Sequence, residues 1–452
     1  MTSMVTSPSP PLPPQHQADQ AIEEILHAQV HGRPLSLVVS PPGAGKTGIV
    51  ERVAAFEAAY NHGRSAVATQ TNAQACDVAR RMRAGFPKLR VTLFVREEYP
   101  VPSWVVAIPG LSIARKSGQI PPGAGIVIAN AARWSWMDRT VVQPFTQLIV
   151  DEAYQLPDYG FAQIAALARR ILLVGDPGQI DPLVTCDIER WACEPDGPHV
   201  ACPTALVARK GGAVWCKDLP VSRRLVPDTV AVVQPAFYPD LSFTSLCPPG
   251  GRALLTAGSG ASALDHAITR ACGGQSIVQL EAPASITGEY DERLAQAMVD
   301  LIDRLFARGA SVRDGTLVTP LTPEMVGVVC AHVSQVAAVR ERLPASRSAI
   351  LVESANRYQG LERALMLVHH PLSGRADADK FHLDAGRLCV SLSRHRVACF
   401  IFARAGIEEM LLRYAPSGER VLGVADDPEF EGGLAHLSIL RALRTQGRIV
   451  PM

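Results

Sequence analysis

A short glycine-containing run between an apolar stretch and a helical pattern carries the clearest chemistry in this sequence. Residues 40–47 read Ser-Pro-Pro-Gly-Ala-Gly-Lys-Thr and match the phosphate-loop pattern G-x-x-x-x-G-K-[ST], except that Ser40 replaces the first glycine. The N–H groups of such a loop, at the start of a helix, bind phosphate oxygens. We expect Lys46 to reach the terminal phosphates of a nucleotide and Thr47 to hold Mg²⁺. The candidate phosphate-binding residues are Pro42, Gly43, Ala44, Gly45, Lys46 and Thr47.

Two further polar groups follow apolar stretches downstream of this loop. Asp151-Glu152 come directly after Leu148-Ile149-Val150. We expect the aspartate to hold Mg²⁺ through water and the glutamate to polarise the attacking water. In the run Gly175-Asp176-Pro177-Gly178-Gln179, the side chain of Gln179 can contact the γ-phosphate or the water and signal its loss. An ordinary Asp-Pro-Gly turn is the alternative interpretation of that run.

These candidate residues follow apolar stretches that alternate with helical patterns. Strands are predicted at 35–39, 65–69, 91–95, 126–129, 148–150 and 171–174, and helices at 19–28, 48–60 and 73–82. This alternation predicts a parallel, doubly wound α/β sheet, in which ligands bind beyond the carboxyl ends of the strands. The residues expected at those ends are Lys46, Thr71, Asn130, Asp151 and Asp176.

The second half of the chain repeats this style without a second phosphate loop. Strands are predicted at 253–256, 277–280, 326–329, 349–352, 365–368 and 399–403, and helices at 289–308 and 335–343. We therefore expect a second α/β domain with a similar sheet and a boundary near 217–225. The predicted organisation is a disordered Pro-rich tail at 1–16, domains at 17–217 and 218–415, and a C-terminal appendage at 416–452 that ends in a helix near 434–444.

Composition limits the classes of partner and compartment. The 452 residues are 47% hydrophobic and 19% charged, with a net charge of +1, so a nucleic-acid surface would have to be a local stripe. Only 6 of the 44 basic residues are lysine, a bias that suits phosphate binding but also fits coding bias. The 10 cysteines are scattered and follow no signal peptide or long apolar span, which predicts reduced thiols in a cytoplasmic protein without a membrane segment. The densest cysteines, Cys186, Cys193, Cys202 and Cys216, fit no compact zinc pattern.

The ordered motifs together resemble superfamily 1 helicases, and in detail their 5′-to-3′, up-frameshift-like branch. The motifs that carry the resemblance are the phosphate loop, Asp151-Glu152-Ala153, 175–179, 222–225 with 237–238, 326–329 with Gln335, 358–362 and 387–394. They span roughly residues 17–405. The resemblance implies two tandem RecA-like domains with parallel sheets, hydrolysis of Mg²⁺-ATP, and movement along single-stranded DNA or RNA.

The resemblance also implies roles for residues around the nucleotide. Arg224 and Arg394 match the arginines that such enzymes direct at the γ-phosphate from the second domain. Glu362 resembles the glutamate that binds the ribose. Gln17 or Gln20 resembles the glutamine that reads the adenine.

The resemblance also concerns the coupling of nucleotide to nucleic acid and the contact with the base of the nucleotide. Gln359-Gly360 resembles the element that couples nucleotide to nucleic acid. Arg223 stands where the branch usually has a tyrosine that stacks on the base, and a guanidinium can also stack there.

Nucleic-acid contacts are expected at strand ends of the first domain, on the side that the resembling family uses for the nucleic-acid strand, and the resemblance adds His332, which stands where that branch often has an aromatic contact. Backbone and hydroxyl groups there can hold phosphates without reading sequence. Trp134 or Trp136 could stack on a base, at about 1–3 kcal/mol per base, although packing of either ring in the core is an equal alternative. The candidate residues are Thr71, Asn72, Asn130, Arg133, Trp134, His332 and Gln359.

Two other functions remain open at this point. One is a phosphate-loop NTPase switch, or a nucleic-acid-binding ATPase, that never unwinds; such a protein needs no arginine from a second domain. The other is a metal-binding scaffold built on the cysteines at 186–216. We expect a monomer, while the choice between DNA and RNA and any protein partners stay open.

Overall fold

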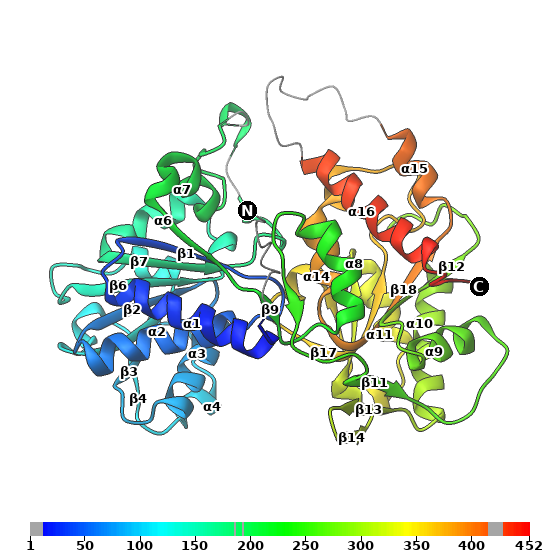
Figure 1. The fold of residues 1–452 in the computed structure, drawn as a ribbon, viewed down its shortest axis with the longest axis horizontal. Helices are drawn as coiled ribbons and strands as arrows, with labels where there is room; N and C mark the ends of the chain where they lie inside the picture. Colours follow the sequence, from blue (N-terminus) through cyan, green and yellow to red (C-terminus); the bar gives the residue numbers. More distant parts are fainter. Residues whose placement is uncertain (1–11, 185–186, 192–193, 415–427) are drawn as a thin grey trace, which may run out of the picture.

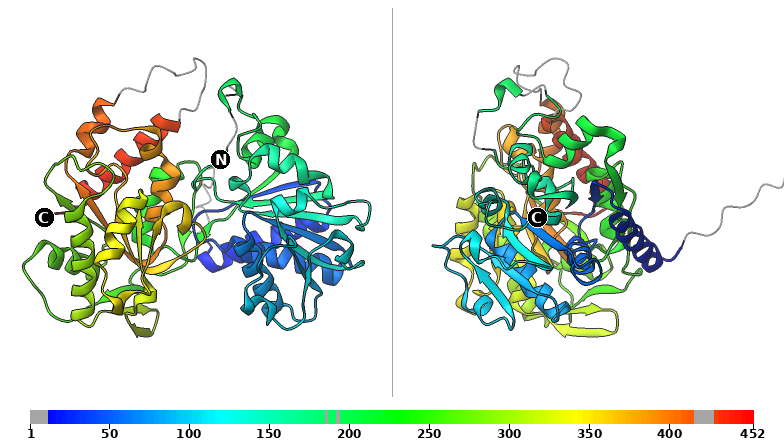
Figure 2. Two further views of the ribbon diagram at one scale, coloured as in Figure 1. Left: turned by 180° about the vertical axis from the view of Figure 1, so that it is seen from behind. Right: turned by 90° about the vertical axis from the view of Figure 1, so that its left-hand side faces the viewer.

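The computed structural model describes residues 12–184, 187–191, 194–414 and 428–452, which form two α/β domains side by side (Figures 1 and 2). Each domain is built on one parallel sheet with helices against its faces. The predicted fold class, two tandem domains of RecA-like type, is confirmed. The predicted tail at residues 1–16 lies mostly outside the described residues, and helix α1 begins within it at Pro14.

The first domain contains an eight-stranded sheet in the order β4-β3-β5-β2-β6-β7-β1-β8, parallel throughout. Its strands are β1 (Leu35–Val39), β2 (Arg64–Thr69), β3 (Val91–Phe94), β4 (Leu111–Ala114), β5 (Gly125–Asn130), β6 (Phe145–Asp151), β7 (Ala168–Gly175) and β8 (Trp215–Asp218). Its helices are α1 (Pro14–Val30), α2 (Lys46–Tyr60), α3 (Asn72–Gly85), α4 (Ser103–Val106), α5 (Ala131–Ser135), α6 (Asp158–Ile164) and α7 (Cys202–Lys210).

Successive residues of the central strands face two different cores. Val67 and Ile149 join the core on one face of the sheet, whereas their neighbours Ala66 and Val150 join the core on the other. Because both faces are covered, these strands read as continuous apolar runs, which is why they were predictable from sequence.

The second domain contains a six-stranded parallel sheet in the order β16-β15-β17-β18-β12-β19. Its strands are β12 (Ile277–Ala282), β15 (Val326–Cys330), β16 (Leu351–Ser354), β17 (Arg363–His369), β18 (His395–Arg404) and β19 (Ile449–Pro451). Its helices are α8 (Pro227–Phe237), α9 (Ala263–Cys272), α10 (Glu292–Ala307), α11 (Val333–Arg342), α12 (Ala355–Tyr358), α13 (Lys380–Leu383), α14 (Ala385–Leu392), α15 (Ile407–Arg413) and α16 (Pro428–Thr445).

Two small sheets lie outside the parallel ones. The predicted strand at 253–256 is β11 (Arg252–Leu255), which pairs antiparallel with β13 (Ser311–Asp314) in a sheet completed by β14 (Leu317–Pro320). Only Leu254 of β11 is fully buried, and a short apolar run does not reveal which kind of sheet it joins. Where the domains meet, β9 (Val221–Ser222) pairs with β10 (Thr244–Ser245).

The C-terminal segment, for which the sequence predicts an appendage, is part of the second domain. Helix α16 packs against α8 and α14, and β19 extends the parallel sheet beside β12 (Figure 1). Arg448 donates hydrogen bonds of 2.5 and 2.6 Å to the carboxylate of Asp228 at the start of α8. The edge strand β19 has only three residues, which is too short for an apolar run to predict it from sequence.

Two further observations concern membrane-spanning helices and the cysteines. Within the described residues no helix is long and apolar enough to cross a membrane. The eight cysteines that the structure describes are all free thiols. Cys186 and Cys193, half of the cysteines in the alternative metal scaffold, lie outside the described residues.

Replacing Leu443 of α16 by alanine tests whether this helix belongs to the folded domain. Leu443 is fully buried in the core it shares with α8 and α14, so its truncation should lower the free energy of unfolding by about 2–5 kcal/mol. Urea denaturation followed by circular dichroism measures the change. Leu434→Ala on the same helix is the matched control, because its side chain is 45% exposed. A loss below about 1 kcal/mol for Leu443→Ala would mean that the helix contributes little to the core.

Candidate nucleotide site between the two domains

The phosphate loop, between β1 and α2, packs directly against the segment that opens the second domain. Gly43 has φ of +71°, and a Cβ at this position would lie 2.2 Å from Cβ of Arg224. The N–H of Arg223 donates to the carbonyl of Gly43 at 2.9 Å, and the Ser222 hydroxyl donates to the carbonyl of Pro42 at 2.6 Å. Glycine is therefore required here by both conformation and space.

Lys46 lies between carboxylates from two neighbouring strands. Its Nζ is 3.5 Å from Oε2 of Glu152 and 3.6 Å from Oδ2 of Asp176. These residues follow β6 and β7; β7 pairs with β1 in the sheet, and β6 pairs with the other edge of β7. Glu152 has φ of +53°, a conformation that costs a residue other than glycine about 1–3 kcal/mol and that often marks functional sites.

The carboxylate of Asp151 is fully buried beside this group. Burial, and then the negative charge of Glu152, raise the pKa of Asp151 to about 7. A carboxyl group held in this way gains stability as its anion when a cation binds beside it.

Asp176 connects the first domain to the second. Its Oδ1 accepts a 2.7 Å hydrogen bond from the hydroxyl of Tyr238, the residue that follows α8. Its Oδ2 accepts a 2.7 Å bond from Nε2 of Gln179, whose Oε1 is buried without a partner among the described residues. A Cβ on Gly386, at the start of α14, would lie 2.5 Å from the carbonyl oxygen of Gln179. The loop after β7 is thus in direct contact with the second domain.

Arg394 is a buried charged residue whose guanidinium has hydrogen-bond donors left unpaired among the described residues. It is 1% exposed, yet within the described chain its Nε and Nη2 find no hydrogen-bond acceptor. Burial, followed by the positive charge of Arg224, lowers the pKa of Arg394, while the carboxylates of Asp176 and Glu152 act in the opposite direction. Buried guanidinium donors without acceptors are costly, so this position suits an anion such as a phosphate.

Arg224 already has partners in this structure. Its Nε donates to Oε2 of Glu362 at 2.7 Å, and its Nη1 donates to the carbonyl of Ser393 at 3.2 Å. The carboxylate for which the resemblance implies a ribose contact is therefore paired with one of the two candidate γ-phosphate arginines.

A cavity of about 930 Å³ between the domains collects most of the predicted residues. The predicted nucleotide and coupling residues that line it are Gly43, Ala44, Gly45, Lys46, Thr47, Asp151, Glu152, Gln179, Arg223, Arg224, Gln359, Gly360, Glu362 and Arg394, and Thr71 lies at its edge. Loop N–H groups, paired carboxylates and an unpaired buried guanidinium fit a nucleoside triphosphate with a divalent cation. Thr47 and Asp151 are the residues that would hold the cation.

The predicted adenine contacts do not line this cavity. Gln17 donates to the carbonyl of Leu12 at 2.5 Å, and Gln20 donates to Glu24 at 2.9 Å. A second hollow of about 290 Å³ adjoins the phosphate loop, and Gln15 lines it instead. Positions 15, 19 and 22 share one face of a 3.6-residue helix, whereas 17 and 20 lie on another, which explains the difference.

Asp176, Tyr238 and Gln70 were not assigned a chemical role from sequence. Asp176 was placed at a strand end, but its contact with Tyr238 joins segments that no local pattern connects. Gln70 donates from Nε2 to the carbonyls of Asp151 at 3.2 Å and Glu152 at 3.3 Å, which ties the end of β2 to the acidic pair. A polar residue at a strand end was the only available signal for Gln70.

The structure separates the predicted tryptophans. Trp134 is fully buried against Phe94 and Phe145, and its Nε1 donates to the carbonyl of Val67 at 2.9 Å. The prediction that Trp134 stacks on a base is wrong, because the ring is part of the core. Trp136 is 76% exposed and remains able to stack.

Other predicted nucleic-acid residues make contacts within the protein. Two donors of Arg133 bond the carbonyls of Val95 and Arg115, and its guanidinium lies on the Phe94 ring. Asn130, the last residue of β5, donates a 2.7 Å hydrogen bond to Asn72, the first residue of α3, and Thr71 caps α3.

The two remaining candidates lie in the second domain. His332 lies 2.8 Å from His382 between their Nε2 atoms. Gln359 lines the interdomain cavity, and its Nε2 is buried without a partner among the described residues.

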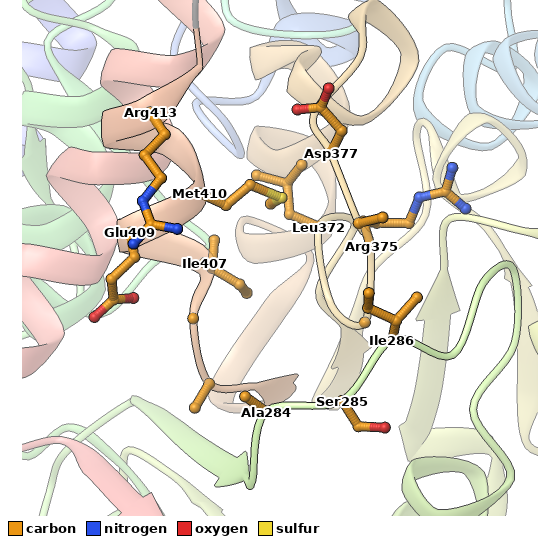
Figure 3. A pocket seen from close by; sticks show the side chains of 14 residues that line it. Ala284, Ser285, Ile286, Leu372, Arg375, Asp377, Ile407, Glu409, Met410 and Arg413 are labelled. Carbon is orange, nitrogen blue, oxygen red and sulfur yellow. The ribbon is translucent and has the colours of Figure 1, made fainter.

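A separate hollow of about 500 Å³ lies at the carboxyl ends of β12, β17 and β18 (Figure 3). Leu372, Ile407 and Met410 lie in its middle, with Arg413 on one side and Arg375, whose guanidinium points outward, on the other (Figure 3). It contains no phosphate loop and none of the residues predicted for the nucleotide.

Comparison with known proteins finds one family match and several similar solved structures. Residues 279–406, within the second domain, match a family described as AAA domain. Among solved structures, the PRRSV helicase is 15% identical, with a TM-score of 0.41, over 85% of this chain and 54% of that one. Arterivirus nonstructural protein 10, a helicase solved with DNA, is 13% identical, with a TM-score of 0.42, over 85% of this chain and 63% of that one.

The viral helicases are longer than the part of them that this chain matches. The chain spans less than two thirds of the viral helicases that it resembles. A search of curated proteins finds no match to this sequence. The chain therefore consists of two parallel-sheet α/β domains, and the second of them contains the match to the family described as AAA domain.

Proposed function

We propose that this chain is an ATP-dependent translocase of helicase type that moves along single-stranded DNA or RNA, in the 5′-to-3′ direction. The observation that carries the proposal is Arg394. Its buried, unpartnered guanidinium comes from the second domain and faces carboxylates and a phosphate loop of the first. Such a site is complete only when both domains take part, as a motor requires. A nucleic-acid partner is supported by the arterivirus helicase that was solved with DNA.

Each residue around the cavity has a chemical role in this proposal. Lys46 and the loop N–H groups bind the β- and γ-phosphates of ATP, and Glu152 orients and deprotonates the attacking water. Mg²⁺, held through Thr47 and Asp151, would neutralise charge on the phosphates. Arg224 and Arg394 stabilise the charge of the transferring phosphoryl group, an effect typically worth about 10³–10⁵ in rate.

Coupling to movement follows from the contacts across the cleft. Asp176 is joined both to Lys46 and to Tyr238 of the second domain, and Gln179 lies against α14. Binding and loss of the γ-phosphate would therefore change how the domains sit, and alternate grips on a strand would turn that change into a step.

ATP hydrolysis with and without single-stranded nucleic acid tests the proposal. We expect a low basal rate that single-stranded DNA or RNA raises at least several-fold, and loss of hydrolysis in Lys46→Ala, because the terminal phosphates lose their cation. Release of inorganic phosphate gives the rate. Tailed duplexes with 5′ or 3′ overhangs, in both chemistries, report polarity and strand separation. Absence of stimulation by either nucleic acid would contradict the proposal.

Replacing Arg394 by methionine separates a motor from a simple NTPase switch. We expect hydrolysis to fall by about 10³-fold or more, since the γ-phosphate loses a fixed cation. The nucleotide-free protein should become more stable by about 1–3 kcal/mol, because a buried unpaired charge is removed. Phosphate release and urea denaturation measure the two effects.

Arg357→Met is the matched control for stability, because Arg357 lines the same cavity with a 74% exposed side chain. Its free energy of unfolding should stay within about 0.5 kcal/mol of the original. Hydrolysis that survives in Arg394→Met would favour the switch.

Trp136→Ala tests the remaining base-stacking candidate. The exposed ring directly follows α5, so if it stacks on a base its loss should weaken binding of single-stranded nucleic acid by about 1–3 kcal/mol. Fluorescence anisotropy of a labelled oligonucleotide measures affinity. Trp104→Ala, 48% exposed on α4, is the control and should bind normally. Equal affinities in all three proteins would remove Trp136 from the interface.

A further inference from the structure

A chain of alternating charges leads from Arg224 out of the nucleotide cavity. Oε2 of Glu362 lies 2.7 Å from Nε of Arg224, and Oε1 lies 3.4 Å from Nη1 of Arg396. Nη2 of Arg396 donates at 2.7 Å to Oδ2 of Asp314, the last residue of β13. The path therefore ends at the β13–β14 hairpin, and neither Arg396 nor Asp314 lines the cavity.

Arg252 of β11 brings the same network back to Arg224. Its Nε donates at 2.9 Å to Oδ1 of Asp314, so one carboxylate holds two arginines. Its Nη1 donates to the carbonyl of Arg224 at 2.6 Å, and its Nη2 donates to the carbonyl of Arg223 at 3.2 Å. Asp314 thus acts on Arg224 twice, on the side chain through Arg396 and Glu362, and on the backbone through Arg252.

The exposure of these groups indicates what the network does. The side chain of Asp314 is 44% exposed and that of Arg396 is 39% exposed, whereas that of Arg224 is 11% exposed. Ion pairs at such exposure contribute only about 0–1 kcal/mol to stability. A long arginine side chain has many rotamers, and a displacement of about 1 Å at a reacting centre can cost roughly 100-fold in rate. The Asp314–Arg396 pair therefore contributes little to folding and can act on the geometry of Arg224, whereas Arg252, whose side chain is 10% exposed, joins Asp314 to the backbone carbonyls of residues 223 and 224.

We propose that Asp314, acting through Arg252 and Arg396, is a positioning residue for Arg224, so that the β13–β14 hairpin outside the cavity sets where this cation stands. The proposal rests on the ATP hydrolysis proposed above. It also gives Glu362 a role: its carboxylate, which accepts a 2.7 Å hydrogen bond from Nε of Arg224, orients that side chain. The hairpin then belongs to the hydrolytic machinery although it contacts no nucleotide.

A double-mutant cycle between Asp314→Asn and Arg224→Ala tests this inference. Asp314→Asn alone should lower kcat for ATP about tenfold, with KM changed less than twofold. In the Arg224→Ala background the same substitution should change kcat less than twofold, because its effect passes through Arg224. Asp314→Glu, which keeps the charge, should recover at least half of the original kcat. A loss equally large in both backgrounds, or no loss in the single variant, would overturn the proposal.

Glu408→Gln is the matched control. Glu408 also holds two arginines of its own domain, Arg441 and Arg444, but it lies away from the interdomain cavity. Its kcat should equal that of the original protein. If Asp314→Asn melts earlier than this control, Arg396→Gln removes the route through Glu362 and leaves the Asp314–Arg252 pair in place, so it should also lower kcat severalfold; an unchanged kcat in Arg396→Gln would overturn the proposal.

Calorimetric binding of ADP and of ADP with aluminium fluoride gives a readout that needs no turnover. Asp314→Asn should weaken binding of the aluminium fluoride complex, which mimics the transferring phosphoryl group, at least fivefold, and that of ADP less than twofold. Equal weakening of both ligands, or of neither, would overturn the positioning role. If the unaltered protein hydrolyses no ATP, the proposed function fails separately from this inference, because the binding comparison still gives its own answer.

Discussion

A buried positive charge without a protein anion is the constraint on which the structure depends. Arg394 is 1% exposed, and two of its guanidinium nitrogens have no acceptor within the described residues. A buried charge left without its partner costs about 3–5 kcal/mol. A phosphate bound at the loop of the first domain would remove that cost, so filling the cavity and fixing the second domain become one event.

The two parallel sheets bring different edges to this site. Lys46, Asp151 and Asp176 belong to the carboxyl ends of strands in the first domain. Glu362 and Arg394 immediately precede β17 and β18, at the amino ends of strands in the second. Because all strands of a parallel sheet start at one edge and end at the other, each domain brings its site residues together at one edge of its sheet. The charges of opposite sign come from strand ends that face each other across the cavity.

Sequence reasoning succeeded where burial leaves a local pattern and failed where distant segments decide. The doubly covered strands read as apolar runs, but β11 and β19 are short and their partners lie far along the chain. No local signal tells a core tryptophan such as Trp134 from an exposed one. The assignment of Gln17 and Gln20 came from the family resemblance; neither lines the cavity, and Gln15, on another face of α1, lines a hollow beside the phosphate loop. The pairing of Arg224 with Glu362 joins residues 138 positions apart and has no local pattern.

A structure of the protein with Mg²⁺ and an ATP analogue tests the central claim most directly. The measurement is the distance from the guanidinium nitrogens of Arg394 to the oxygens of the terminal phosphate. The account predicts a separation of about 3 Å, a direct hydrogen bond from the second domain to a phosphate held by the first. A guanidinium that stays buried and unpaired while the phosphate binds elsewhere would contradict it.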